Sequence, residues 1–243
     1  MPKQSWSIVV FCFNEVGAVE EVVRRIINLF DEHRKDLYEV LVVDDGSTDG
    51  SYEKIVALHR ARSDVVGVIR HQKNLGIGPT LIDGYRSARN ENLTAIPADG
   101  QFDVRELQSY LNVEDGTFVS FYRLENVQYS TFRSLLSAAN KWVNRYFNGI
   151  ELKDVNWVKV YKRSTIMSFP WKLSSSLIES EICAKLLLCG MRPIEVLSYY
   201  HPRQSGKSKG ASLVTIFRAL RETPKLIWAV RSFGLALKKT AKT

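Results

Sequence analysis

Two kinds of apolar pattern alternate along the first hundred residues. Short continuous runs rich in β-branched residues predict buried strands at Ser7–Phe13, Val40–Val43, Val65–Arg70 and Leu93–Pro97. Between them, apolar residues recur every three or four positions, which predicts helices over about 14–30, 48–62 and 79–90. This order predicts an α/β fold: a doubly wound, mostly parallel sheet with right-handed crossovers and helices on both faces.

The second half has a less regular pattern. A strand at Thr117–Tyr122 precedes a long amphipathic helix expected over about 132–147, and strands at 154–161 and 193–198 flank a helix at 177–189. With 243 residues, 45% of them hydrophobic, the chain suits one large domain. We place that domain at residues 1–210 and a basic, amphipathic helical tail at 211–243.

The net charge of +8 is confined to the residues from Lys207 onward. From Lys207 to the end there are nine Lys and Arg residues and one acidic residue, Glu222, whereas basic and acidic residues balance over positions 1–206. Two interpretations stay open: the tail contacts an anionic membrane surface, or its helices pack on their own domain with a solvated basic face. No nucleic-acid-binding motif accompanies the charge, so no nucleic-acid partner is expected.

The location follows from two further features. Cys12, Cys183 and Cys189 lie in apolar surroundings without paired spacing, which predicts buried thiols in a reducing compartment. The chain has no apolar run long enough for a signal or a membrane span. We therefore expect a cytoplasmic protein, peripherally associated with a membrane through the tail or a separate membrane protein; a homo-oligomer remains open.

Acidic residues follow directly after the second predicted strand. Asp44 and Asp45 end the run Val40–Val43, at the sheet edge where ligands bind in open α/β folds. They are candidates to accept hydrogen bonds from a base or a ribose. The alternative is that they cap the next helix together with Ser47 or Thr48.

Several motifs together resemble family 2 glycosyltransferases of the GT-A fold. The motifs are Phe11-Cys-Phe-Asn-Glu15, Val43-Asp-Asp-Gly-Ser-Thr-Asp49, Asn74-Leu-Gly76 and Ala98-Asp-Gly-Gln101. Further resemblance is to the polyprenyl-phosphate subgroup, the one that contains dolichyl-phosphate mannose synthase, and lies in Arg123, Arg133, Glu181 and the run Arg203-Gln-Ser-Gly-Lys-Ser-Lys209.

The resemblance implies a donor site and a metal site. The donor is a UDP- or GDP-hexose, and the residues expected around its nucleotide are Phe11, Glu15, Asp44, Asp45, Asn74 and Asp99. Asp99 and Gln101 would hold Mg²⁺ or Mn²⁺ against the pyrophosphate, as oxygen ligands suit hard cations. Asp45 is the strongest candidate for reading the base.

Two departures from the family pattern stand out. Pro97 occupies the position where the family usually has the first Asp of a D-x-D motif, so one carboxylate is lost beside the expected metal. Trp157 stands where the subgroup often has small residues, which changes the expected sugar pocket.

The resemblance also implies an acceptor site. Arg123, Arg133 and Arg203, extended by Ser208 and Lys209, would bind the acceptor phosphate, because guanidinium groups pair bidentately with phosphate oxygens. Asp99, Glu181 and Arg203 are the expected catalytic residues.

The expected reaction is inverting transfer of a hexose to a polyprenyl phosphate at the cytosolic membrane face. The alternatives are transfer to a sugar hydroxyl of a glycan or glycolipid, with Glu181 as base, and a catalytically impaired nucleotide-binding member of the fold.

Overall fold

The computed structural model describes residues 4–33, 37–123, 144–145, 148–199, 201 and 213–240, with side chains from Arg221 onward in the last segment. Seven strands within these ranges form one sheet in the order β3-β2-β1-β4-β6-β5-β7. The strands are β1 (Trp6–Cys12), β2 (Tyr38–Asp44), β3 (Val66–Arg70), β4 (Asn92–Pro97), β5 (Thr117–Arg123), β6 (Lys159–Lys162) and β7 (Arg192–Ser198). All pairs are parallel except those made by β6, so the predicted α/β fold with a mostly parallel sheet is confirmed.

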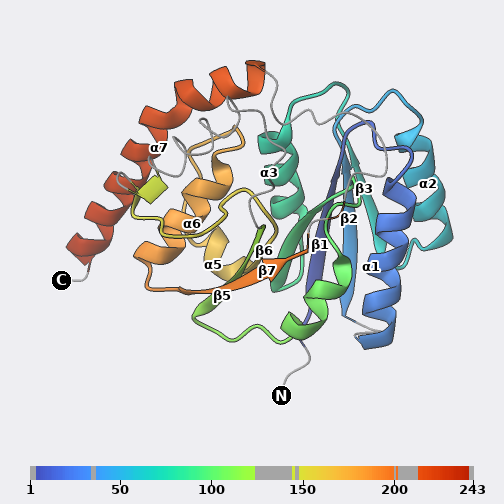
Figure 1. The fold of residues 1–243 in the computed structure, drawn as a ribbon, viewed down its shortest axis with the longest axis horizontal. Coiled ribbons are helices and arrows are strands. Elements are labelled where there is room, and N and C mark those ends of the chain that lie inside the picture. Colours follow the sequence, from blue (N-terminus) through green and yellow to red (C-terminus); the bar gives the residue numbers. More distant parts are fainter. Residues whose placement is uncertain are drawn as a thin grey trace.

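Helices cover both faces of the sheet, as predicted (Figure 1). They are α1 (Val19–His33), α2 (Ser51–Ala61), α3 (Ile77–Ser87), the 3₁₀ helix η1 (Val104–Tyr110), α5 (Arg163–Met167), α6 (Ile178–Leu188) and α7 (Leu213–Thr240). η1 and α5 were not predicted, since segments of five to seven residues are too short to show a helical period.

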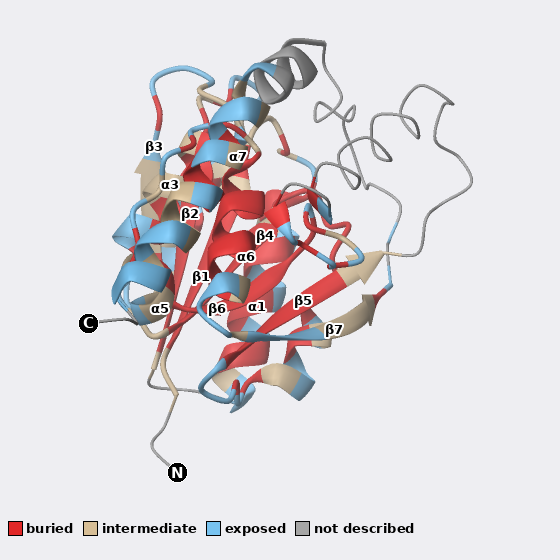
Figure 2. Cartoon of the chain, turned by 90° about the vertical axis from the view of Figure 1, so that its left-hand side faces the viewer, coloured by how far each residue is buried: buried red, intermediate tan, exposed pale blue. Residues whose placement is uncertain are grey.

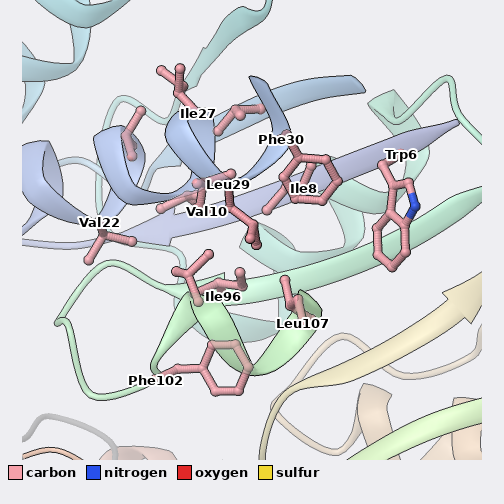
Figure 3. Close-up of a cluster of buried hydrophobic side chains, with 14 of the residues drawn as sticks. Trp6, Ile8, Val10, Val22, Ile27, Leu29, Phe30, Ile96, Phe102 and Leu107 are labelled. Atoms are coloured by element: carbon pink, nitrogen blue, oxygen red, sulfur yellow. The ribbon is translucent and has the colours of Figure 1, made fainter. Parts of the chain in front are cut away.

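Successive side chains of β1 point alternately into two separate hydrophobic cores. Ile8 and Val10 face α1 and η1, in the apolar cluster drawn in Figure 3, whereas Val9 faces α3 and α6. Because the sheet is sandwiched between these cores, β2 is buried throughout and β1 is buried except at Phe11, and Figure 2 shows buried residues in red. This explains why they read as continuous apolar runs.

Three boundaries and one burial prediction need correction. The first helix begins at Val19 rather than near Asn14, and the strand predicted over 154–161 is limited to Lys159–Lys162. The third helix begins at Ile77, before Pro79. Cys12 and Cys183 are buried as predicted, but Cys189 is exposed, because α6 ends one residue before it.

The tail forms one helix that packs against the domain. α7 is 28 residues long and lies along α6, with Leu226, Ala229 and Val230 buried. For the side chains described, this agrees with an amphipathic helix packed on its own domain. The expected boundary near 206–210 and most of the helix expected over 132–147 lie outside the described residues.

Candidate active site

The carboxyl ends of the four parallel strands β1 to β4 lie at one edge of the sheet. In register, Cys12 lies opposite Asp44, Asp44 opposite Arg70, and Phe11 opposite Pro97. Backbone hydrogen bonds continue beyond the strands, from Asp45 N to Cys12 O (2.8 Å), from His71 N to Asp44 O (2.8 Å) and from Ala98 N to Phe11 O (3.1 Å). The motifs after β1, β2, β3 and β4 are therefore neighbours.

Hydrogen bonds fix the loop after β1 to the loop after β2. Asn14, with a φ of 55°, donates its N–H to Ser47 Oγ (2.9 Å), and its side-chain oxygen accepts from Thr48 N (2.8 Å). Next to it, Glu15 N donates to Ser51 Oγ (2.9 Å). The Glu15 side chain is largely buried beside this junction, at 9% exposure.

Asp45 connects the second loop to the third. Its Oδ1 accepts from Leu75 N (2.8 Å) and lies 2.8 Å from His71 Nδ1, and its Oδ2 accepts from Gly76 N (2.9 Å). The other imidazole nitrogen of His71 lies 3.1 Å from Asp83 Oδ2. Asp45 thus positions the loop that carries Asn74.

Gly46 permits this close approach. With a φ of +73°, it adopts a conformation that favours glycine, and a Cβ there would lie 2.6 Å from the carbonyl carbon of Lys73. Lys73 and Asn74 themselves are exposed. The structure therefore presents Asn74 to solvent on a loop whose base is held by Asp45.

Asp44 lies deeper than Asp45. Its side chain is fully buried, accepts from Ser47 N (3.3 Å) and lies 3.8 Å from Arg70 Nε. Burial raises the pKa of the Asp44 carboxyl, while Ser47 and Arg70 oppose that change. Burial, with the neighbouring Asp44 charge, also raises the pKa of the Cys12 thiol to about 12. Asp44 is thus a supporting residue beneath the edge.

The expected metal residues follow β4. Asp99 and Gln101 are 5% and 7% exposed, and Gln101 N donates to Asp99 Oδ1 (3.0 Å). Among the described residues no group of three or more His, Cys, Asp or Glu side chains is arranged to hold a metal ion. With Pro97 in the strand, the loop offers a carboxylate and an amide oxygen. That donor set fits a hard cation only if phosphate oxygens and water complete its coordination.

Two segments from the second half of the chain approach this edge. His201 N donates to Gln101 O (3.0 Å), and Tyr199 N to Glu106 Oε1 (2.9 Å), so the chain leading toward Arg203 starts beside the Asp99–Gln101 loop. Arg123, at the end of β5, donates to Asp154 Oδ2 (2.8 Å).

Trp157 lies under the Arg123 side chain. The Arg123 guanidinium carbon lies 4.3 Å from the centroid of the Trp157 ring, and Trp157 Nε1 donates to Ser198 Oγ (2.9 Å). Trp157, which stands where the subgroup often has small residues, therefore makes a cation–π contact that orients Arg123, one of the expected acceptor residues. Arg133, Arg203, Ser208 and Lys209 lie outside the described residues.

The structure holds Glu181 in contacts within the domain. Glu181 is fully buried in α6, accepts from Lys172 N and Leu173 N (2.9 Å each), and pairs with the buried Lys185. Glu179, the neighbouring acidic residue, accepts from the hydroxyls of Tyr85 and Tyr161. Both carboxylates serve internal contacts, and the structure gives no support to Glu181 as a base.

His71 is the residue that sequence reasoning missed. None of the four histidines in the sequence belongs to a recognisable metal or triad pattern, so no motif points to His71. Its position directly after β3 was the available signal, since residues that follow a strand parallel to β2 reach the same edge as Asp45.

A sheet of this order, with acidic and amide residues gathered after its first, second and fourth strands, defines an α/β protein that binds a ligand at its carboxyl edge. The model of glycosyl transferase family 2 matches residues 7–162, so the chain belongs to this family of glycosyltransferases. The expected family and enzyme class are thereby confirmed.

Solved structures share the fold at low sequence identity. Mannosyl-3-phosphoglycerate synthase from Rubrobacter xylanophilus is 18% identical with a TM-score of 0.62, and the match covers 99% of this chain and 76% of that one. Glucosyl-3-phosphoglycerate synthase from Mycobacterium tuberculosis, in complex with Mn²⁺, UDP and phosphoglyceric acid, is 16% identical with a TM-score of 0.60, covering 95% and 78%. A mannosyltransferase from Pyrobaculum calidifontis, in complex with GDP-Man and Mn²⁺, is 16% identical with a TM-score of 0.59, covering 99% and 80%.

These structures agree with the GT-A-like fold, and their bound Mn²⁺ and nucleotides are in line with the expected kind of donor and cofactor. They do not single out the polyprenyl-phosphate subgroup. No helix in the described part of the chain combines the length and the hydrophobicity of a membrane span.

Proposed function

We propose that this glycosyltransferase moves a hexose from a UDP- or GDP-sugar to a polyprenyl phosphate, with inversion at the anomeric carbon, at the cytosolic face of a membrane. The donor binds along the carboxyl edge, where Glu15, the Asp45-supported loop with Asn74, and Asp99 lie on neighbouring strand ends. Phe11 lies partly buried at the end of β1 beside them.

Mg²⁺ or Mn²⁺ held by Asp99, Gln101 and the donor pyrophosphate would neutralise the charge that develops on the departing nucleoside diphosphate. The bond from the anomeric carbon to the diphosphate breaks with its electron pair, and an acceptor oxygen forms the new bond from the opposite side. Asp99 binds the cation, and the Asp45 contacts orient the donor loop.

The burial of Glu181 is the observation that favours a phosphate over a hydroxyl as the acceptor. A sugar hydroxyl must lose a proton during attack, whereas a phosphate oxygen is already anionic near neutral pH. Glu181, the base suggested for the hydroxyl alternative, has its carboxylate engaged by Lys172, Leu173 and Lys185. An acceptor that needs no base therefore fits better.

The hydrogen bond from His201 to Gln101 supports the same acceptor. It brings the chain to within two residues of Arg203 at the metal loop, and Arg203 begins the run that includes Ser208 and Lys209. The cationic and hydroxyl residue types in this run suit an acceptor phosphate.

A soluble phosphorylated acid is the second candidate acceptor. The Mycobacterium tuberculosis structure contains phosphoglyceric acid together with UDP and Mn²⁺, and it shares this fold. Such an acceptor would also use phosphate-binding arginines.

The test is transfer of labelled hexose from UDP- and GDP-sugars, with and without Mn²⁺, to polyprenyl phosphate, phosphoglyceric acid and a glycan hydroxyl. We expect Mn²⁺-dependent transfer to polyprenyl phosphate. Asp99→Asn should lower turnover by about 100-fold or more while the protein stays folded. Transfer to phosphoglyceric acid or a glycan alone would reject the lipid acceptor, and full activity of Asp99→Asn would reject the metal assignment. Nucleotide binding that Mn²⁺ does not strengthen, without turnover of any donor, would instead indicate the impaired member of the fold.

A further inference from the structure

The solvent-facing side of α7 combines basic and large apolar residues. Arg221, Lys225, Trp228, Leu235 and Lys239 follow one another at spacings of four, three, seven and four residues, which places them on one face of the helix. All five are exposed, with Trp228 at 61% and Leu235 at 63%. We call these five residues the outer face of α7.

The opposite side of α7 is fixed to the domain. Leu226, Ala229 and Val230 are buried against α6, and the Phe233 ring lies 5.6 Å from that of Phe169. The packed side therefore already accounts for the helix being ordered on the protein. Trp228 and Leu235 are not among the buried residues of that packing.

None of the α7 residues on the outer face is acidic. Glu222 is the only acidic residue between Lys207 and Thr243, and its carboxylate accepts from Ser175 N (3.1 Å) and Ser174 Oγ (3.3 Å). It is therefore turned toward the domain. Lys238 is exposed and adds to the positive charge beside the outer face.

We propose that the outer face of α7 docks the protein on an anionic lipid surface. Lys and Arg would pair with lipid headgroups while Trp228 and Leu235 enter the headgroup layer, as on interfacial helices. A second copy of the chain fits the face less well, since Arg221, Lys225 and Lys239 would oppose like charges. Nucleic acid would leave the two apolar residues without a function.

This surface also lies suitably for the proposed lipid acceptor. Ser174, which contacts the first part of α7, lies against the start of α3 at the carboxyl edge: a Cβ on Gly78 would lie 2.2 Å from the Ser174 carbonyl oxygen. Docking through α7 would therefore keep the edge near the membrane. The docking itself does not depend on which acceptor is used.

Sedimentation of the full-length protein with vesicles tests the proposal. The vesicles contain phosphatidylcholine alone or mixed with phosphatidylserine, and neither polyprenyl phosphate nor nucleotide sugar is present, so a wrong acceptor assignment would leave the result unchanged. We expect binding to the anionic vesicles only. The double variant Lys225→Gln/Lys239→Gln should bind about 25-fold more weakly, because each basic residue contributes about fivefold.

Two further variants make the test specific. Arg24→Gln/Arg60→Gln changes the net charge equally on α1 and α2 and should bind like the wild type. Trp228→Ala leaves the charge unchanged and should weaken binding. Failure of the wild type to bind anionic vesicles, equal losses in both double variants, wild-type binding by Trp228→Ala, or α7-dependent binding of nucleic acid in place of vesicles would each overturn the proposal.

Discussion

Two pairs of acidic residues, at the carboxyl edge and in α6, have similar burial but different surroundings. Asp44 and Asp45 follow a strand, Glu179 and Glu181 lie on a helix, and none of the four is more than 8% exposed. Asp45 contacts loops that border the expected donor site, whereas Glu181 contacts a lysine and backbone inside the layer of α5, α6 and α7. Proximity of carboxylates in sequence therefore does not show which of them reach the edge; their position relative to the strand ends separates those that contact the edge loops from those in internal contacts.

Replacing Glu181 by Gln should have the largest effect on stability. The change leaves the Lys185 ammonium buried without its carboxylate, and breaking a buried ion pair in this way costs about 3–5 kcal/mol. We expect the melting temperature to fall by about 10 °C. Thermal unfolding followed by circular dichroism measures this.

Glu20→Gln is the matched control, since it removes the same charge from an exposed pair with Arg24. Its effect should stay below about 0.5 kcal/mol. If Glu181→Gln kept wild-type stability but lost transferase activity, Glu181 would act on the substrate and the comparison would fail.

Asp45→Asn should have an intermediate effect. The Asn amide has one acceptor oxygen where the Asp carboxylate has two, so the variant loses at least one of the hydrogen bonds with Leu75 N, Gly76 N or His71. This loss should lower the free energy of unfolding by about 2 kcal/mol. Faster hydrogen exchange at the amides of Leu75 and Gly76 would report the loosened loop, and calorimetry should show weaker nucleotide binding.

The pattern of these two measurements sharpens the role of Asp45. Weaker nucleotide binding with unchanged exchange at residues 75 and 76 would mean that Asp45 reads the base directly, as the sequence predicted. Faster exchange together with weaker binding would identify it as a positioning residue for the Asn74 loop.

Glu179→Gln should have the smallest effect, and a pH-dependent one. Burial raises the pKa of Glu179 in the folded protein, so the folded state binds its proton more tightly than the unfolded state does. Wild-type stability should therefore fall as pH rises from about 4.5 toward that raised pKa, whereas Gln does not titrate.

Urea unfolding between about pH 4.5 and pH 8 measures the free energy of unfolding of the wild type and of Glu179→Gln. The two values should differ by no more than about 1 kcal/mol, and the difference should shift in favour of the Gln variant as the pH rises. A difference that shifts toward the wild type instead would show that the Glu179 carboxylate is stabilised as an anion.

The sequence predicted the fold better than the details of the site. Strand ends at Asp44 and Pro97 and the helix face from Val19 to Phe30 came from patterns within ten to fifteen residues, and the structure confirms them. The partners of Asp45 are 26 to 31 residues away, and no local pattern indicates that His71 and Gly76 would meet it.

By itself, the sequence determined the alternation of strands and helices, the family, and the basic character of the tail, because each is recorded in local composition or motif order. Only the tertiary structure decided which acidic residues support loops at the sheet edge, which are internal, and which side of α7 faces solvent. Those outcomes depend on contacts between distant segments, where burial and hydrogen-bond geometry select among residues that look alike in the chain.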